Sequence, residues 1–256
     1  MSTGGNKLSI YGTEAGVRAV ANPVRRKILD LLETGEQSFD RIVASSGRAK
    51  STISAHLSDL VDEGIVGSRH GEDDERKKYF FLTSRCIGSF SPSDRLTDEL
   101  EVYALEYRDG SIDPFALYKL VYRIFRVSLM MEGISIDPLL RRCGESVGEA
   151  IYPAVFAADT ETLLSNLSLF WEHHQLGRIH DTTLEPLSFS VSNCFECAEL
   201  PQLGRPACSF DTGLLSVIFS KHMGRTVHAV ERECYAAGDS RCSFEFLFPD
   251  EEETGI

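Results

Sequence analysis

The sequence lacks several features that mark common functional classes. Its 256 residues contain no run of 18 consecutive apolar residues, so we expect no transmembrane helix and no membrane partner. The first ten residues have no apolar core of the kind found in signal peptides, which predicts a cytoplasmic protein. A nucleotide-binding glycine loop, an HExxH pair and a nucleophile elbow are also missing, which argues against an enzyme.

Basic side chains are scarce outside the first third of the chain. Residues 1–85 hold 13 of the 26 Lys and Arg residues and 12 of the 39 Asp and Glu residues, a net charge of +1. The rest of the chain therefore holds 13 basic and 27 acidic residues, a net charge of −14. Because an acidic surface repels nucleic acid, any contact with double-stranded DNA must come from the front part.

Three short helices are predicted in that front part. The first begins near Pro23 and ends before Gly35, and the second is a short helix that Ser38 can cap. The third covers residues 49–63 and turns its apolar side chains inward, at Ile53, Leu57, Leu60 and Val61. A short helix, a tight turn with glycine and a second helix are typical of a helix-turn-helix.

The opposite face of the third helix is slim and not acidic. A helix that enters the major groove needs such a face to approach bases and phosphates. The same pattern is also compatible with the solvated face of another helical bundle. The candidate DNA-binding residues here are Arg48, Lys50, Ser51, Thr52, Ser54 and His56.

Two short strands with a polar hairpin between them follow the helices and predict a wing. Four basic residues at its base are candidates for contacts with the phosphate backbone: Arg69, Arg76, Lys77 and Lys78. The segments NPVRRKILDLL, STISAHLSDLVDEGIV and RKKYFFL resemble the ArsR-type winged-helix repressors. Two features depart from that family: the wing tip is acidic, and the third helix carries no CxCxxC metal motif.

The composition divides the chain into three parts. Residues 1–85 are the predicted winged helix-turn-helix domain, residues 86–114 a linker with a helix or strand of its own, and residues 115–256 a sensor domain. Long apolar helical runs followed by alternating strands give the sensor domain an α+β fold with an antiparallel sheet. The chain is thus a multidomain protein. Cys86, in the linker, is either a buried small hydrophobe or a redox partner, and we expect Cys143 to pack.

Five of the seven cysteines fall between residues 194 and 242. Structural disulfides are disfavoured in the cytosol, so this clustering indicates a metal site, redox chemistry or both. Cys194 and Cys197 form a CxxC motif, which is typical of a dithiol switch, and we take them as candidate redox thiols. Four unliganded, buried cysteines are the alternative for the remainder of the set.

The segments NCFECAEL and PACSFDTGLLSVIFSKHMGRTVHAVERECYAAGDSRCSFEFLFP resemble the four-vinyl-reductase domain. That resemblance implies a mixed α/β fold, shared with vesicle-tethering TRAPP subunits and phenol-sensing bacterial activators, that dimerises and binds a small apolar ligand or a metal. It also implies a ligand set for a tetrahedral metal such as zinc: Cys208, Glu231, Cys234 and Cys242. Glu233 and His228 remain alternatives to Glu231.

The combination of both resemblances with this cysteine set is similar to one narrower family, the methanogen-specific vinyl-reductase-domain regulators (MsvR). These are archaeal, redox-responsive transcription factors. The resemblance implies a homodimeric regulator that binds promoter DNA and responds to oxidation of its thiols. The alternative is a regulator that binds a small apolar or aromatic effector, with cysteines that only hold a structural metal.

Overall fold

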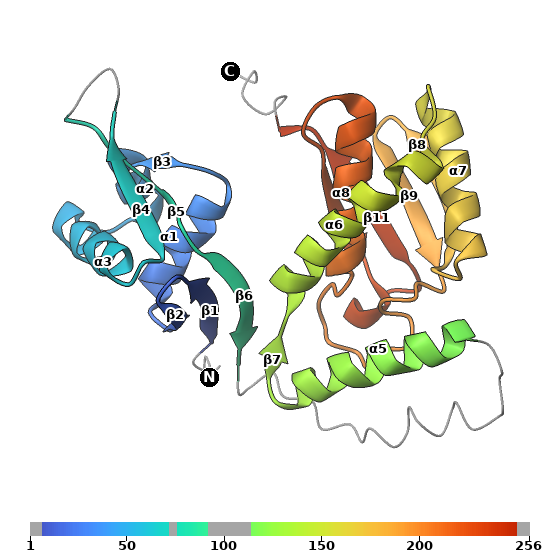
Figure 1. The fold of residues 1–256 in the computed structure, drawn as a ribbon, viewed down its shortest axis with the longest axis horizontal. Coiled ribbons are helices and arrows are strands. Elements are labelled where there is room, and N and C mark those ends of the chain that lie inside the picture. Colours follow the sequence, from blue (N-terminus) through green and yellow to red (C-terminus); the bar gives the residue numbers. More distant parts are fainter. Residues whose placement is uncertain (1–6, 72–75, 92–113, 250–256) are drawn as a thin grey trace. The chain divides into compact units, whose positions relative to one another are not determined.

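The computed structural model describes residues 7–71, 76–91 and 114–249. They form two compact units, shown in Figure 1. The first unit comprises the described residues up to 91 together with the short segment 132–136, and the second comprises the other residues from 114 onward. Within the described part of the chain, no helix has the length and apolarity needed to cross a membrane.

The first unit contains the three predicted helices. They are α1 (Pro23–Glu33), α2 (Phe39–Ser46) and α3 (Lys50–Asp62). Asn22 caps α1 and Ser38 caps α2, each through a side-chain oxygen that accepts backbone N–H groups of the first turn. The three helices enclose an apolar core made by Ile28, Leu29, Leu32, Ile42, Ile53, Leu57 and Leu60.

The predicted wing is present as a small antiparallel sheet. Its strands are β3 (Gln37–Ser38), β4 (Val66–His70) and β5 (Lys78–Leu82), in the order β3-β5-β4. The acidic wing tip, residues 72–75, lies outside the described residues. The base of the wing is therefore held against α2 by β3, the strand that leads into that helix.

A second sheet in the first unit was not predicted from the sequence. It consists of β1 (Leu8–Thr13), β2 (Gly16–Val20), β6 (Arg85–Phe90) and β7 (Ile134–Ser135), all antiparallel, in the order β2-β1-β6-β7. β7 is contributed by a segment more than 40 residues after β6, so the first unit is not continuous in sequence.

This sheet changes where the first unit ends. The sequence places the boundary at residue 85, but β6 begins there and pairs with β1, because its backbone finds a hydrogen-bonding partner in the N-terminal hairpin. Cys86 therefore lies on β6, half-buried opposite Tyr11, and not in a linker. The helix or strand expected within the linker, near residues 99–107, lies outside the described residues.

The second unit has four helices among its described residues. They are α5 (Pro114–Met131), α6 (Asp137–Val155), α7 (Thr160–His173) and α8 (Ser209–Met223). In Figure 1, α5 runs along one end of this unit, and α7 lies beside the strands β8 and β9.

The strands of the second unit form one antiparallel sheet in the order β10-β11-β9-β8. Their bounds are β8 (Arg178–Leu184), β9 (Leu187–Ser192), β10 (His228–Glu233) and β11 (Cys242–Leu247). The expected α+β fold with an antiparallel sheet is confirmed. Every second side chain of β11 enters the core, as its alternating sequence predicts: Cys242, Phe244 and Phe246.

Glycines allow α6 and α8 to pack with their backbones in close contact. A Cβ atom at Gly144 would lie 2.0 Å from the carbonyl oxygen of Phe210, and one at Gly213 would lie 2.0 Å from the carbonyl oxygen of Arg141. No side chain fits at either position. This contact, together with packing of α8 on β10, fixes the N-terminus of α8 and the residue that precedes it, Cys208.

Candidate functional site

Five cysteine sulfurs converge around the N-terminus of α8. Cys194 and Cys197 follow β9, Cys208 is the N-cap residue of α8, Cys234 follows β10, and Cys242 begins β11. All five residues are at most 1% exposed, and none forms a disulfide. Ends of three strands and one helix thus supply the cluster, which explains why its members are scattered in sequence.

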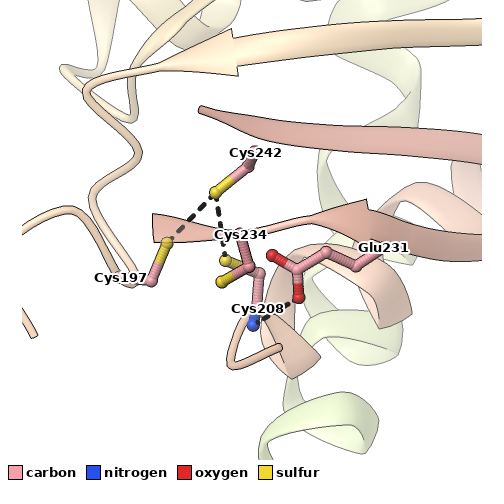
Figure 2. Close-up of side chains that lie close together, drawn as sticks. All are labelled: Cys197, Cys208, Glu231, Cys234 and Cys242. Atoms are coloured by element: carbon pink, nitrogen blue, oxygen red, sulfur yellow. Dashed lines mark hydrogen bonds between the residues drawn. The ribbon is translucent and has the colours of Figure 1, made fainter. Parts of the chain in front are cut away.

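Four of these sulfurs and one carboxylate are close enough to share a cation. Donor atoms of Cys197, Cys208, Glu231, Cys234 and Cys242 all lie within 4.8 Å of one another, as Figure 2 shows. The Sγ atom of Cys242 lies 3.1 Å from that of Cys197 and 3.7 Å from that of Cys208. Thiolates on a tetrahedral zinc, with Zn–S bonds of about 2.3 Å, would lie about 3.8 Å apart. The donor set therefore fits a thiophilic cation such as zinc.

The structure brings together all four residues proposed as metal ligands. Glu231 Oε2 also accepts a hydrogen bond of 2.9 Å from the backbone N–H of Cys208. Of the two alternatives to Glu231, Glu233 accepts a hydrogen bond of 2.8 Å from Arg241 instead, and His228 is exposed on β10. The geometry favours Glu231, and the ligand role of the four residues stays a prediction.

The two candidate redox thiols occupy different parts of the cluster. Cys197 lies with the sulfurs around Cys242, whereas Cys194 Sγ lies 3.6 Å from Cys208 Sγ and 3.5 Å from Asp211 Oδ2. Each thiol of the CxxC motif therefore faces a sulfur outside that motif. The remaining cysteine of the second unit, Cys143, is exposed on α6, so the expectation that it packs was wrong.

Two buried acids beside the sulfurs were missed by the sequence analysis. Glu196 lies between the cysteines of the CxxC motif, and Asp211 lies in the first turn of α8. Both are 1% exposed. The available signal was their position, since each stands within three residues of a cluster cysteine in CFEC and CSFD.

Two carboxylate oxygens at the cluster have no protein partner. Asp211 Oδ1 and Glu231 Oε1 are buried and accept no hydrogen bond from the described residues. Burial raises the pKa of the Glu231 carboxyl to about 8 and raises the pKa of Asp211 well above its ordinary value. Because an unpaired buried carboxylate is costly, both groups require either a proton or a cation.

A buried arginine supplies positive charge next to the sulfurs. Arg126, on α5, donates from Nη1 to the main-chain oxygen of Glu196 at 3.2 Å and to its Oε1 at 3.3 Å. Its Nη2 donates to the carbonyl oxygen of Ala207. These two acceptors immediately precede Cys197 and Cys208, so α5 holds both cysteine-bearing segments in place.

The Glu196 carboxylate also caps α8. Its two oxygens accept the backbone N–H groups of Phe210 and Asp211, each at 3.0 Å. An acid at the positive end of a helix is favoured, and it satisfies N–H groups that have no partner within the helix. Burial raises the pKa of Glu196, and the adjacent Arg126 guanidinium opposes that rise.

The candidate DNA-reading face lies on α3 and the residues before it. Its exposed members are Arg48, Lys50, Ser51, Thr52 and Ser54. Lys50 Nζ lies 3.0 Å from Asp40 Oδ1, an exposed ion pair that a phosphate can replace. His56 is half-buried with its Nδ1 atom enclosed, because it stands next to the buried Leu57, so it is less available than expected.

Three of the four wing residues are exposed: Arg76, Lys77 and Lys78. They line, with Ser54, a surface groove between α3 and β5. Arg69 is held by Glu36 through two hydrogen bonds of 2.8 and 2.6 Å, and these bonds lower the pKa of that carboxyl. A phosphate contact by Arg69 therefore has to compete with Glu36.

Comparison with protein families matches both halves of this arrangement. Residues 22–68 match the bacterial regulatory protein, arsR family, and residues 187–248 match the four-vinyl-reductase (vinyl-4-reductase) domain. The chain joins an ArsR-family helix-turn-helix domain to a four-vinyl-reductase domain. The second match contains all five cysteines of the cluster. The ArsR-family match indicates a DNA-binding regulator of transcription rather than an enzyme.

Curated relatives are similar to parts of this chain. Two uncharacterized proteins of Methanocaldococcus jannaschii are 28% identical over 34% of the chain and 23% identical over 53% of it, and the matches cover 55% and 76% of those proteins. A probable mercury resistance operon repressor of Streptomyces lividans is 32% identical over 28% of the chain and 63% of that repressor. The chain thus spans about half the length of the first of these relatives.

Two solved structures share local similarity. A vinyl-4-reductase family protein from Methanocaldococcus jannaschii is 17% identical, with a TM-score of 0.38, and the match covers 59% of this chain and 96% of that one. The phenol-responsive sensory domain of the transcription activator PoxR, with phenol, is 14% identical, with a TM-score of 0.35, over 79% and 95% of the two chains.

Proposed function

We propose that the protein is a DNA-binding transcriptional regulator whose four-vinyl-reductase domain senses redox state through cysteine thiols that also hold a metal such as zinc. The observation that carries this proposal is the convergence of five buried sulfurs in a chain that also has an ArsR-family domain. Packing alone needs no such cluster, whereas a thiol switch requires sulfurs within reach of one another.

In this proposal the exposed face of α3 reads base edges in the major groove. Ser51, Thr52 and Ser54 are small donors, and the cations around them contact phosphates: Arg48, Lys50, Arg76, Lys77 and Lys78. Arg69 joins them where a phosphate displaces Glu36. His56 contributes only where its exposed edge reaches the DNA.

We further propose a homodimer. One recognition helix contacts too few base pairs for useful specificity, and two half-sites solve this problem. An apolar face on α5 supports the proposal, since Tyr118, Val121 and Phe125 are 72%, 58% and 56% exposed. Exposed aromatic and aliphatic side chains in such a row are typical of an interface between subunits.

The proposed redox step joins Cys197 and Cys242, whose sulfurs lie 3.1 Å apart. Both thiols lose a proton and an electron to a peroxide, which gives one disulfide and two molecules of water. The disulfide pulls the segment that contains Glu196 and so disturbs the cap of α8. In a dimer, such repacking changes the spacing of the two recognition helices and weakens simultaneous docking.

Gel-shift titration of promoter DNA, with and without a thiol reductant, tests the proposal. We expect affinities in the two states to differ by about tenfold or more, within the usual range of coupling between sites. Cys197→Ser should abolish the difference, and Cys143→Ser, an exposed cysteine outside the cluster, is the matched control. Identical affinity of the unmodified protein in both states would end the redox proposal.

A second candidate function is regulation by a small apolar or aromatic effector, with the cysteines confined to a structural metal. A surface groove between α7 and β8 favours it, because apolar side chains line part of its wall at Leu164, Leu169, Ile179 and Leu184. Replacing Cys194 and Cys197 by Ser would then leave regulation intact. The same gel shift, repeated with these variants, distinguishes the two functions.

A further inference from the structure

The cluster contains more donors than one tetrahedral ion uses. The two groups of neighbouring donors comprise five cysteines together with Asp211 and Glu231, seven residues in all, and the groups have Cys208 in common. A structural zinc takes about four ligands. Two four-coordinate ions that share one bridging ligand use about seven.

The second group has the contacts of a ligand set in its own right. Donor atoms of Cys194, Cys208 and Asp211 lie within 4.8 Å of one another, and each residue is 1% exposed. The separation of 3.6 Å between the sulfurs of Cys194 and Cys208 is close to the spacing of about 3.8 Å expected for two thiolates on one zinc ion.

An unpartnered oxygen points independently to a cation at this second group. Asp211 Oδ2 lies 3.5 Å from Cys194 Sγ, but Oδ1 is buried with no hydrogen-bond partner among the described residues. Asp211 is also held firmly, because its N–H is bound by Glu196 at the start of α8. A protonated Asp211 that donates to the Cys194 sulfur is the competing arrangement, and it leaves the other oxygen unsatisfied.

We propose that the cluster binds two thiophilic divalent cations that share Cys208. One lies among Cys197, Cys234 and Cys242, and the other lies between Cys194 and Asp211. Glu231, bound to the N–H of the shared Cys208, provides the seventh donor. The inference rests on the proposed function, and it makes Cys194 a ligand of a second ion instead of a free thiol.

The test is metal analysis of the full-length protein purified without oxygen and loaded with zinc. We expect about two zinc ions per chain, and about one in Asp211→Asn and in Cys194→Ser. Cys143→Ser should keep two, since that cysteine is exposed on α6. One zinc ion per chain in the unmodified protein, or two in both variants, would overturn the inference. So would a stoichiometric content of iron and acid-labile sulfide.

Titration with Co²⁺ supplies a readout that folding defects do not mimic. The first equivalent should give thiolate-to-cobalt charge-transfer absorption, and the second should lower the magnetic moment per cobalt, because a bridging sulfur couples the two ions. In Asp211→Asn the absorption should remain and the lowering should be lost. An undiminished moment at saturation in the unmodified protein would contradict the shared sulfur. Gel shifts on the same samples report separately on the redox proposal, which fails only if oxidation leaves DNA affinity unchanged.

Discussion

At the scale of single residues, Arg126 connects the helix α5 to the sulfur cluster. Its side chain is 2% exposed, that of its partner Glu196 is fully enclosed, and their charged atoms lie 3.3 Å apart. A buried ion pair is not by itself strongly stabilising, but loss of one partner leaves the other charge without compensation. Arg126 therefore matters more for the integrity of the cluster than for its chemistry.

Arg126→Met should lower the free energy of unfolding by about 3–5 kcal/mol, because Glu196 would remain buried without its counter-charge. Denaturant unfolding followed by circular dichroism measures the change. Arg141→Ala removes a half-exposed pair with Glu145 on α6 and serves as the control, with an expected loss of at most about 0.5 kcal/mol. Equal losses in both variants would contradict this role of Arg126.

Glu231 and Glu233 provide a matched test of the carboxylate in the ligand set. Glu231→Gln should weaken zinc binding by about tenfold or more, because the enclosed oxygen loses its charge. Glu233→Gln should leave the affinity unchanged, since that carboxylate is bound to Arg241. Competition with a chelator of known affinity measures both. A larger effect at Glu233 would exchange the two assignments.

At the scale of elements, the contact between α6 and α8 positions the cluster. Gly144 and Gly213 let the two backbones touch, so the N-terminus of α8 has one well-defined place relative to the sheet. Glycine is unfavourable inside helices, by about 1 kcal/mol relative to alanine. Its presence at these contacts is explained by the lack of space for a side chain.

Gly213→Ala should destabilise the protein although alanine is the better helix former. The new Cβ atom would meet the carbonyl oxygen of Arg141, and overpacking of this kind costs about 1–3 kcal/mol. Thermal unfolding measures the effect. Ser146→Ala, at an exposed position on α6, is the control and should change the melting temperature little. A stabilised Gly213→Ala variant would show that the helices can separate without cost.

At the scale of the whole molecule, the two units are joined through one short strand. The chain passes from α5 in the second unit into β7, which pairs with β6 in the first unit, and returns to α6 in the second. The strand β6 follows the wing strand β5 in sequence. A displacement of α5 at the cluster therefore has a covalent route to the sheet that contains β6.

Gly88→Ala should interrupt this route. A Cβ atom at Gly88 would lie 2.6 Å from the carbonyl oxygen of Ser135, so β7 has to move away from β6. We expect DNA binding in the reduced state to persist and its response to oxidation to be lost, as measured by gel shift. Gly12→Ala, in the same sheet but with its new atom at 3.7 Å from Ile87, is the control. A full response in Gly88→Ala would exclude transmission through β7.

The sequence by itself determined the local elements and the kinds of chemistry. Capping residues and apolar spacing at Asn22, Ser38 and Leu57 were enough to predict the helices of the first unit, because these signals act within a few residues. The clustering of cysteines indicated metal or thiol chemistry. The pairing of β6 with β1 and β7 was not predictable, since it depends on partners distant in sequence.

Only the tertiary structure decided which donors meet. The sequence favoured Cys194 with Cys197 by spacing, but the folded chain places Cys197 beside Cys242 and Cys194 beside Cys208 and Asp211. The physical reason is that burial of the sheet and of α8 fixes the ends of these elements, and the sulfurs and carboxylates lie at those ends. Proximity in the chain does not determine proximity in such a core, where long-range packing sets each position.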